Sequence, residues 1–157
     1  MIEYRKADLA DFEKLLSARI DFLLDAGNIQ TPDQSAQMRS ANEEYIEEGM
    51  GNDSLLYFLA LNGDEIIGTC SISFFRLPPN RHNPMGKTGY IGNVYTRSDF
   101  RRQGIASELL DLTVKEAMSR GCGKIMLNAT QMGRGLYEKY GFVDDEDGML
   151  YFIQRDN

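Results

Sequence analysis

The chain has 157 residues, a length typical of one domain, and its composition of 42% hydrophobic and 26% charged residues is that of a globular protein. A formal net charge of −7 argues against a nucleic-acid partner, and two cysteines with one histidine are too few for a disulfide framework or a metal site. Because no apolar run approaches the roughly 20 residues that span a bilayer, and the N-terminus lacks signal-peptide features, we expect a single cytoplasmic domain over residues 1–157 with no membrane partner.

A short strand and two helices are predicted first. The strand is Ile2–Arg5, and the first helix runs over Asp8–Ala26, where Asp8 is a capping residue and apolar residues recur with helical spacing. A second helix follows over Thr31–Glu48. We expect Gly49 and Gly51 to end it, since glycine favours helix termination.

A β-hairpin and a long loop are predicted next. Leu55–Leu61 and Glu65–Phe75 have strand-like apolar runs, and Asn62–Asp64 between them is a good hairpin turn. Arg76–Gly89 contains three of the four prolines and reads as a long exposed loop. Loops of this length are often functional, so His82 within it is a candidate substrate-binding residue.

The second half alternates strands and helices. The predicted segments are Tyr90–Thr96 (strand), Gly104–Arg120 (helix), Lys124–Asn128 (strand), Gly135–Tyr140 (helix), Phe142–Asp144 (strand) and Met149–Gln154 (strand). This order indicates an α+β or α/β sandwich with a mixed sheet. The strand–helix–strand unit from Tyr90 to Asn128 is expected to place its two strands parallel.

A cationic turn between a strand and a helix carries the chemistry. Arg101 and Arg102 precede Gly104 and Ala106, which open the helix with small side chains. The start of a helix presents unpaired N–H groups and partial positive charge, so this turn can bind a diphosphate. It lacks the pattern of a triphosphate P-loop and the GxGxxG dinucleotide fingerprint. A solvated basic turn that binds nothing is the alternative.

The downstream context adds a resemblance to a known family. Arg101-x-x-Gly104-x-Ala106 matches the acyl-CoA signature of the GCN5-related N-acetyltransferase (GNAT) superfamily. The segment Leu136–Phe142, with Tyr137 and Gly141, is similar to the Tyr-x-x-x-Gly-Phe segment of that superfamily. The two motifs stand in the family's order, one helix and one strand apart, and the element order fits over essentially the whole chain.

The resemblance implies a mostly antiparallel seven-stranded sheet with about four helices and a central parallel β-α-β unit that binds acetyl-CoA as cosubstrate. The pantetheine arm would pair with the backbone of Tyr90–Thr96, and the pyrophosphate would lie at the start of the next helix. The residues assigned to acetyl-CoA are Val94, Tyr95, Thr96, Arg101, Arg102, Gln103, Gly104, Ile105, Ala106, Ser107 and Asn128.

The resemblance also assigns a catalytic role to Tyr137, at the position of the family's general acid. Proton transfer from a free phenol to a free thiolate is uphill by roughly 2 kcal/mol, which a strengthening hydrogen bond can offset. Many relatives place a glutamate on the fourth strand where this chain has Asn93, which cannot act as a base but is a candidate for substrate binding. Glu47 and His82 are the other substrate-binding candidates. The candidates for the general base are Glu43, Glu44, Glu47 and His82. The alternative is that all four are solvated surface residues.

The expected function is therefore an N-acetyltransferase that moves the acetyl group of acetyl-CoA directly to a primary amine of a small molecule, without a covalent enzyme intermediate. Two alternatives stay open: a non-catalytic acyl-CoA-binding or regulatory module, and an acetyltransferase acting on proteins or peptides. Relatives often dimerise through terminal strands, and the apolar Met149–Ile153 segment would permit a homodimer.

Overall fold

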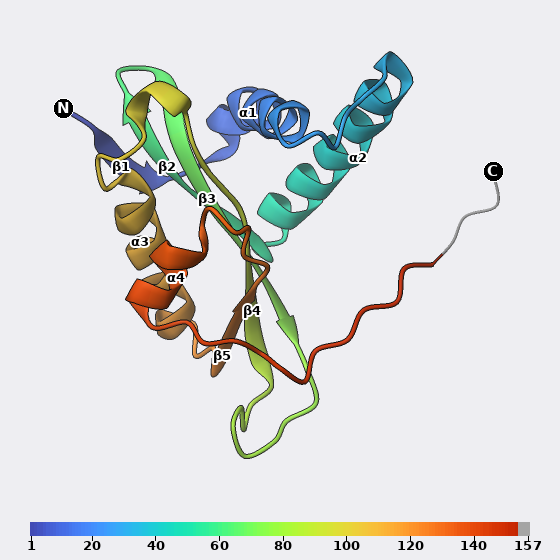
Figure 1. Ribbon diagram of the computed structural model, residues 1–157, viewed down its shortest axis with the longest axis vertical. Helices are drawn as coiled ribbons and strands as arrows, with labels where there is room; N and C mark the ends of the chain where they lie inside the picture. Colours follow the sequence, from blue (N-terminus) through green and yellow to red (C-terminus); the bar gives the residue numbers. More distant parts are fainter. Residues whose placement is uncertain (154–157) are drawn as a thin grey trace.

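In the computed structural model, which describes residues 1–153, five strands form one sheet in chain order, with helices on both faces (Figure 1). Neighbouring strands are antiparallel except for the last pair, which is parallel. The elements are β1 (Glu3–Lys6), α1 (Phe12–Asp25), α2 (Pro32–Gly51), β2 (Leu55–Asn62), β3 (Glu65–Arg76), β4 (Lys87–Thr96), α3 (Ile105–Ser119), β5 (Lys124–Leu127) and α4 (Arg134–Tyr140), with 3-10 turns at Leu9–Asp11 and Ser98–Phe100. The α+β sandwich expected from the sequence is confirmed.

The sheet separates two apolar cores. Strand side chains alternate between faces, so Leu55, Tyr57 and Leu59 of β2 pack against α1 and α2. Phe58 and Ala60 point to the opposite face, where they pack with α3 and with Tyr137 of α4. Figure 1 shows the same division, with α1 and α2 on one side of the sheet and α3 and α4 on the other.

The parallel β-α-β unit is present, and its strands separate. β4 and β5 pair from Thr88↔Lys124 to Ile91↔Leu127, where the pairing ends. β4 continues for five more residues to Thr96, and on that edge it has no strand partner within residues 1–153. The backbone groups of this stretch are therefore available to another chain-like molecule on the side that faces away from β3.

The two terminal strands are a correction to the sequence prediction. Phe142–Asp144 and Met149–Ile153 form no strand, so the described sheet has five strands and not seven; Gln154 lies outside the described residues. Phe142 is held against α4 instead, with its ring 5.9 Å from that of Tyr137. The following segment leads away from the sheet (Figure 1), so it has no edge with which to pair.

The expected Arg76–Gly89 loop is also too long. β3 extends to Arg76 and β4 begins at Lys87, and these two residues are paired in the ladder. The shorter connection is fixed by Asn83, which is 3% exposed and donates from Nδ2 to the Lys87 carbonyl and the Thr88 hydroxyl. Prolines and polar residues signalled a loop here, but the buried Asn83 organises it into a tight structure that lets the strands pair further.

Gly49 does not end the second helix, which continues to Gly51. A Cβ on Gly49 would lie 2.5 Å from Leu55 Cβ, so glycine is needed there for close packing of α2 on β2. By contrast, the predicted Asn62–Asp64 turn is confirmed: β2 ends at Asn62, β3 begins at Glu65, and Gly63 has the positive φ of 62° that such turns require.

Candidate active site

The start of α3 has the geometry of an anion site. Gly104 is the N-cap residue with φ 80°, and no side chain caps the helix. The first N–H groups of α3, from Ile105, Ala106 and Ser107, therefore keep their hydrogens available. A Cβ built on Gly104 meets nothing within 4 Å, so the space above the turn is open. Arg102 just before it also has a left-handed φ, 64°, which bends the chain sharply into the helix.

The charged side chains of this turn differ in what they contact. Arg97 is already paired with Asp99 at 2.7 Å and with Glu65 at 3.0 Å. Arg101 is exposed and donates from Nε to the Thr96 carbonyl at 3.0 Å. Arg102 is exposed and, within residues 1–153, has no carboxylate partner. The turn therefore keeps positive charge for an external anion, in contrast to the neutralised Arg97.

The open edge of β4 leads to this turn. Val94, Tyr95 and Thr96 are all half-buried, and Tyr95 packs edge-on against Phe22 of α1 at 5.9 Å. Gln103 is exposed in the turn. Exposed backbone on β4 and exposed N–H groups on α3 thus form one continuous path for an extended ligand with an anionic end.

Asn128 lies across the gap between the separating strands, directly after β5. Its Nδ2 donates to the Tyr90 hydroxyl at 3.1 Å. This bond links the end of β5 to β4, next to the place where their pairing stops. Sequence reasoning missed Tyr90, since a tyrosine in a strand carries no signal of its cross-strand partner.

Asn93 occupies a β-bulge in β4. The pairing register with β3 shifts between Thr69 and Ser71, and Asn93 has a left-handed φ of 47°. Its carbonyl accepts from the Thr69 hydroxyl at 2.9 Å, and its Nδ2 donates to the Tyr57 hydroxyl at 3.4 Å. Its side-chain oxygen, Oδ1, is buried with no partner in the described structure. A buried unpaired acceptor is costly, so this atom is suited to receive a donor from a ligand.

Tyr137 lies on α4 with 8% of its surface exposed. Burial, with a smaller effect from Cys70, raises the pKa of Tyr137 to about 12. The phenol is therefore protonated throughout the neutral range and can donate a hydrogen bond. Tyr140 on the same helix is 39% exposed and donates to Asp111 at 3.0 Å, so the two tyrosines have different environments.

Within residues 1–153, no hydrogen bond or ion pair links His82 or Glu47 to this site. His82 is in the β3–β4 connection, next to the start of β4, whereas Asn93 is six residues along that strand, about 20 Å away. Its Nε2 accepts from Arg81 at 3.3 Å. Glu43, Glu44 and Glu47 are exposed on α2. In the same helix segment, Ile46 is buried against β2, and the Tyr45 hydroxyl contacts Ser73 Oγ at 2.5 Å.

An acidic cavity of about 450 Å³ lies beside Tyr95, between α1 and the β2–β3 turn. Four carboxylates line it, against Lys14 and Arg97. Lys14 donates to the Asp64 carbonyl, and Arg97 is paired as described, so the cavity keeps an excess of negative charge. The four carboxylates are Glu13, Asp21, Asp64 and Glu65.

A family model described as "Acetyltransferase (GNAT) family" matches residues 22–142 of this chain. The match includes β4, α4 and the turn that precedes α3. The chain belongs to the acetyltransferase (GNAT) family.

Solved structures agree with this membership over nearly the whole chain. A predicted acetyltransferase from Clostridium acetobutylicum, crystallised with acetyl-CoA, is 36% identical, with 97% of this chain and 96% of that chain covered and a TM-score of 0.87. A GCN5-related N-acetyltransferase from Ralstonia eutropha JMP134 is 23% identical, covers 97% and 99% of the two chains, and has a TM-score of 0.84. At that identity the second likeness shows the fold alone.

A curated relative matches part of this chain. N-alpha-acetyltransferase 30 from Xenopus laevis is 28% identical over 103 residues, which are 62% of this GNAT chain and 35% of the relative. The match thus spans about a third of that protein. It therefore concerns one region of a longer relative.

Proposed function

We propose that this GNAT protein is an N-acetyltransferase that transfers the acetyl group of acetyl-CoA directly to a primary amine of a small molecule. The observation that carries the proposal is the parting of β4 from β5 next to the open, cationic start of α3. Residues 1–157 would form one such domain, and a cytoplasmic location stays a prediction. Among residues 1–153, no helix is both long and apolar enough to cross a bilayer.

The residues present fit acetyl-CoA. The N–H groups of Ile105, Ala106 and Ser107 would bind the pyrophosphate, because Gly104 leaves the space above them open. Arg101, Arg102 and Gln103 would add donors at the rim, since neither arginine has a carboxylate partner within residues 1–153.

The donor's pantetheine would follow the backbone of Val94, Tyr95 and Thr96, with Asn128 on the opposite side of the gap. When bound, acetyl-CoA supplies an activated thioester carbonyl. The backbone N–H of Val94, in the stretch of β4 beyond its pairing with β5, would polarise that carbonyl.

Tyr137 would act as a hydrogen-bond donor to the leaving sulfur. With a phenol pKa of about 12 against about 8.5 for a thiol, complete proton transfer to a free thiolate would be uphill by about 5 kcal/mol. A hydrogen bond that strengthens as negative charge develops avoids that cost. The buried phenol is therefore better suited to stabilising the thiolate than to protonating it fully.

The acidic cavity beside Tyr95 supports an acceptor that is a cation before it reacts. An alkylamine carries a positive charge at about pH 7. Asp21, which has no ion-pair partner within residues 1–153, would attract it, together with Glu13, whose contact with Arg39 is as long as 3.7 Å. Its N–H groups could then reach the unpaired Oδ1 of Asn93. In this proposal the acceptor would bind on the α1–α2 face of the sheet and the donor at the gap beside β5.

Thiol release from acetyl-CoA across a panel of small amines tests the proposal. We expect turnover with at least one amine and a loss of about 10²–10⁴-fold in kcat for Tyr137→Phe. Tyr140→Phe is the matched control and should retain turnover, since that phenol contacts Asp111 on the exterior. Full activity in Tyr137→Phe would contradict the catalytic role.

Donor binding is tested separately by calorimetry. Arg102→Glu combined with Gly104→Glu should abolish acetyl-CoA binding by filling the open space and repelling phosphate. Unchanged affinity would overturn the assignment of the pyrophosphate site. Tight acetyl-CoA binding without turnover on any amine would instead identify a non-catalytic acyl-CoA-binding module.

A protein or peptide N-terminus is the second candidate acceptor, favoured by the likeness to N-alpha-acetyltransferase 30. An N-terminal amine has a pKa near 8, so it is deprotonated more easily than an alkylamine. Such an acceptor would depend less on a general base, which the strand lacks because Asn93 stands in place of a glutamate. Mass spectrometry of a peptide mixture after incubation with acetyl-CoA distinguishes the two, because only this acceptor class gains 42 mass units (about one acetyl group) at a peptide N-terminus.

We also propose a homodimer formed through the C-terminal segment. Five consecutive large apolar side chains, Met149–Ile153, are 80–94% exposed and lie away from the sheet, while β5 has an unpaired edge. A segment of this length could pair with β5 of a second copy, which would hide both features. Light scattering should give twice the monomer mass for the full chain and the monomer mass for a chain truncated after Gly148. A monomeric full chain would exclude this arrangement.

A further inference from the structure

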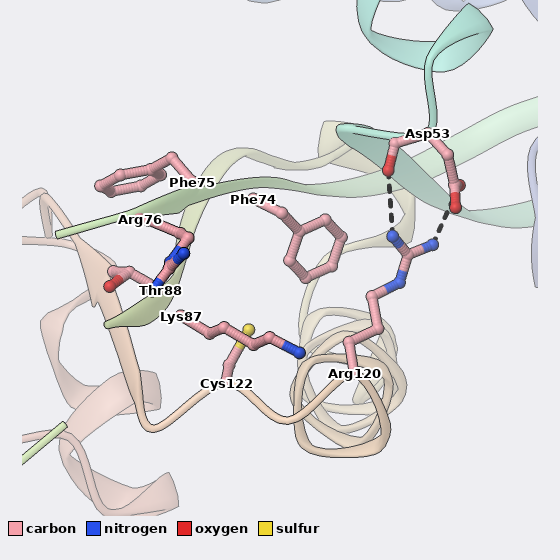
Figure 2. A pocket seen from close by; sticks show the side chains of 8 residues that line it. All are labelled: Asp53, Phe74, Phe75, Arg76, Lys87, Thr88, Arg120 and Cys122. Atoms are coloured by element: carbon pink, nitrogen blue, oxygen red, sulfur yellow. Dashed lines mark hydrogen bonds and ion pairs between the residues drawn. The ribbon is translucent and has the colours of Figure 1, made fainter. Parts of the chain in front are cut away.

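A second cavity lies at the opposite end of α3 from the proposed donor site. It has a volume of about 570 Å³, within the range of small-molecule sites. α3 has 15 residues, so the two ends are about 22 Å apart. None of the residues that line this cavity belongs to the proposed active site. Figure 2 shows all eight: Asp53, Phe74, Phe75, Arg76, Lys87, Thr88, Arg120 and Cys122.

One wall of the cavity is fixed by Arg120. Its Nη2 donates to Asp53 Oδ1 and its Nη1 to the Asp53 carbonyl, both at 3.0 Å, and its Nε contacts Glu116 at 3.4 Å. The guanidinium lies 4.3 Å from the centre of the Phe74 ring. Both flat groups are thus held in place before any ligand arrives, and the charge of Arg120 is already neutralised.

The charge of Lys87 is not neutralised in this way. Its side chain extends along the cavity below the Phe74 ring toward Arg120 (Figure 2). Within residues 1–153 its ammonium forms no ion pair and donates no hydrogen bond. Lys87 is also the direct cross-strand partner of Arg76, whose Nη2 donates only to the Met85 carbonyl at 3.1 Å. Like charges in paired positions destabilise a sheet, so two adjacent cations here favour an anion between or beside them.

The local charge is opposite to that of the whole chain. Three cations and one carboxylate line the cavity, whereas the protein as a whole carries a net charge of −7. Lys87 and Arg120 also act together on Cys122, where they lower the pKa of the thiol although burial, the larger effect, raises it. In an acidic protein, a basic cavity with an aromatic wall is selective for a small anion that has an apolar part.

We propose that this cavity binds a small aromatic anion, with Lys87 and Arg76 binding its phosphate or carboxylate group and Phe74 contacting its ring. The site is separate from the acetyl-transfer site and does not depend on the function proposed for it.

Nuclear magnetic resonance of the full chain tests the proposal, with phenyl phosphate as the probe and saturating CoA present to block the start of α3. We expect shifts of the amides of Lys87, Gly121 and Cys122 that saturate at millimolar probe, while the amides of Gly104 and Ala106 do not move. Benzoate should shift the same amides. Benzyl alcohol, which has a similar ring and no charge, should not.

Variants then separate binding from structural effects. Lys87→Met should weaken phenyl phosphate binding about tenfold, the effect of losing one charge-assisted hydrogen bond. Lys115→Met removes the same charge from an exposed position of α3 and should leave the affinity unchanged. The proposal is overturned if no cavity amide shifts, if benzyl alcohol gives the same shifts, or if Lys87→Met binds as wild type does. The last result would mean that Lys87 only offsets the negative end of the α3 dipole.

Discussion

The hydroxyl of Tyr57 accepts a hydrogen bond from Asn93 Nδ2 at 3.4 Å, and so connects buried β2 with the bulge of β4. Tyr57 is only 2% exposed, and burial raises the pKa of its phenol, which therefore stays protonated at neutral pH. The bond orients the amide of Asn93 while its Oδ1 is left without a partner. Tyr57 is thus a positioning residue for the atom that we propose receives the acceptor amine.

Tyr57→Phe should raise KM for the amine several-fold and leave KM for acetyl-CoA unchanged. It should also lower the free energy of unfolding by about 1–2 kcal/mol, because the buried Asn93 amide loses its partner. Steady-state kinetics with each substrate varied in turn measures the first effect. Tyr45→Phe, at a 49% exposed tyrosine bonded to Ser73, is the control and should change stability by less than about 0.5 kcal/mol. Equal changes in both KM values would refute the positioning role.

The pH dependence of kcat should show no loss from Tyr137 at about pH 10, where a free phenol ionises. Because the pKa of Tyr137 is raised to about 12, the donor form persists up to that pH and is lost only above it. The ratio of wild-type kcat to that of Tyr137→Phe should therefore be constant from about pH 7 to about pH 10, where the upper limit is the pKa of a free phenol. A ratio that falls with an apparent pKa near 10 would show a solvated phenol.

Gly49→Ala should lower the free energy of unfolding by about 1–3 kcal/mol, since the new Cβ would lie 2.5 Å from Leu55 Cβ and force α2 away from β2. Gly51→Ala is the matched control on the same helix. A Cβ there meets nothing within 4 Å, so alanine should be neutral or stabilising by up to about 1 kcal/mol. Urea unfolding of both variants measures the difference, and a Gly49→Ala protein as stable as wild type would show that the contact can relax.

Asp11 should contribute to stability in a pH-dependent way. Hydrogen bonding to Arg5, at 2.7 and 2.9 Å, lowers the pKa of Asp11 below its usual value. A lowered pKa stabilises the fold above the unfolded value, near 4, and this contribution is lost as the pH falls through the lower folded value. Asp11→Asn should therefore cost about 1–3 kcal/mol at pH 7, and the cost should shrink below pH 4 (about the pKa of a free aspartate). The Asp11 carboxylate also accepts a hydrogen bond from the Asp8 backbone N–H at 2.8 Å. Thermal unfolding at a series of pH values tests the prediction, and a cost independent of pH would mean that only this helix-capping bond matters.

Local patterns predicted most of the fold. The alternation of β2, the turn at Gly63 and the apolar spacing of α1 and α3 each follow from interactions between residues close in sequence. The strands at Phe142–Asp144 and Met149–Ile153 were wrong because strand propensity cannot show whether a partner edge is within reach. The same limit applied to Gly49, whose purpose is a contact with Leu55 six residues later.

The candidate site was predictable where it depends on contiguous residues. The turn from Arg101 to Ala106 and the segment around Tyr137 are short motifs, and the family match includes both. Tyr57 and Tyr90 were missed because their hydrogen-bond partners are 36 and 38 residues away in the sequence. The basic cavity was missed because its lining comes from several elements between Asp53 and Cys122. His82 was proposed because it lies in a long loop, and that loop is at the other end of β4 from Asn93. The role of Glu47, which is exposed on α2, stays a prediction.

The two cores on opposite faces of the sheet share no buried residue. Substitutions in the α1–α2 layer are therefore expected to add independently to those beneath α3, as is usual for sites without shared contacts. Evolution could then change the α1–α2 layer, where we propose that the acceptor binds, while the core beneath α3 keeps its packing. Such modularity would let proteins with this fold acquire new amine acceptors without changes to the proposed coenzyme A site.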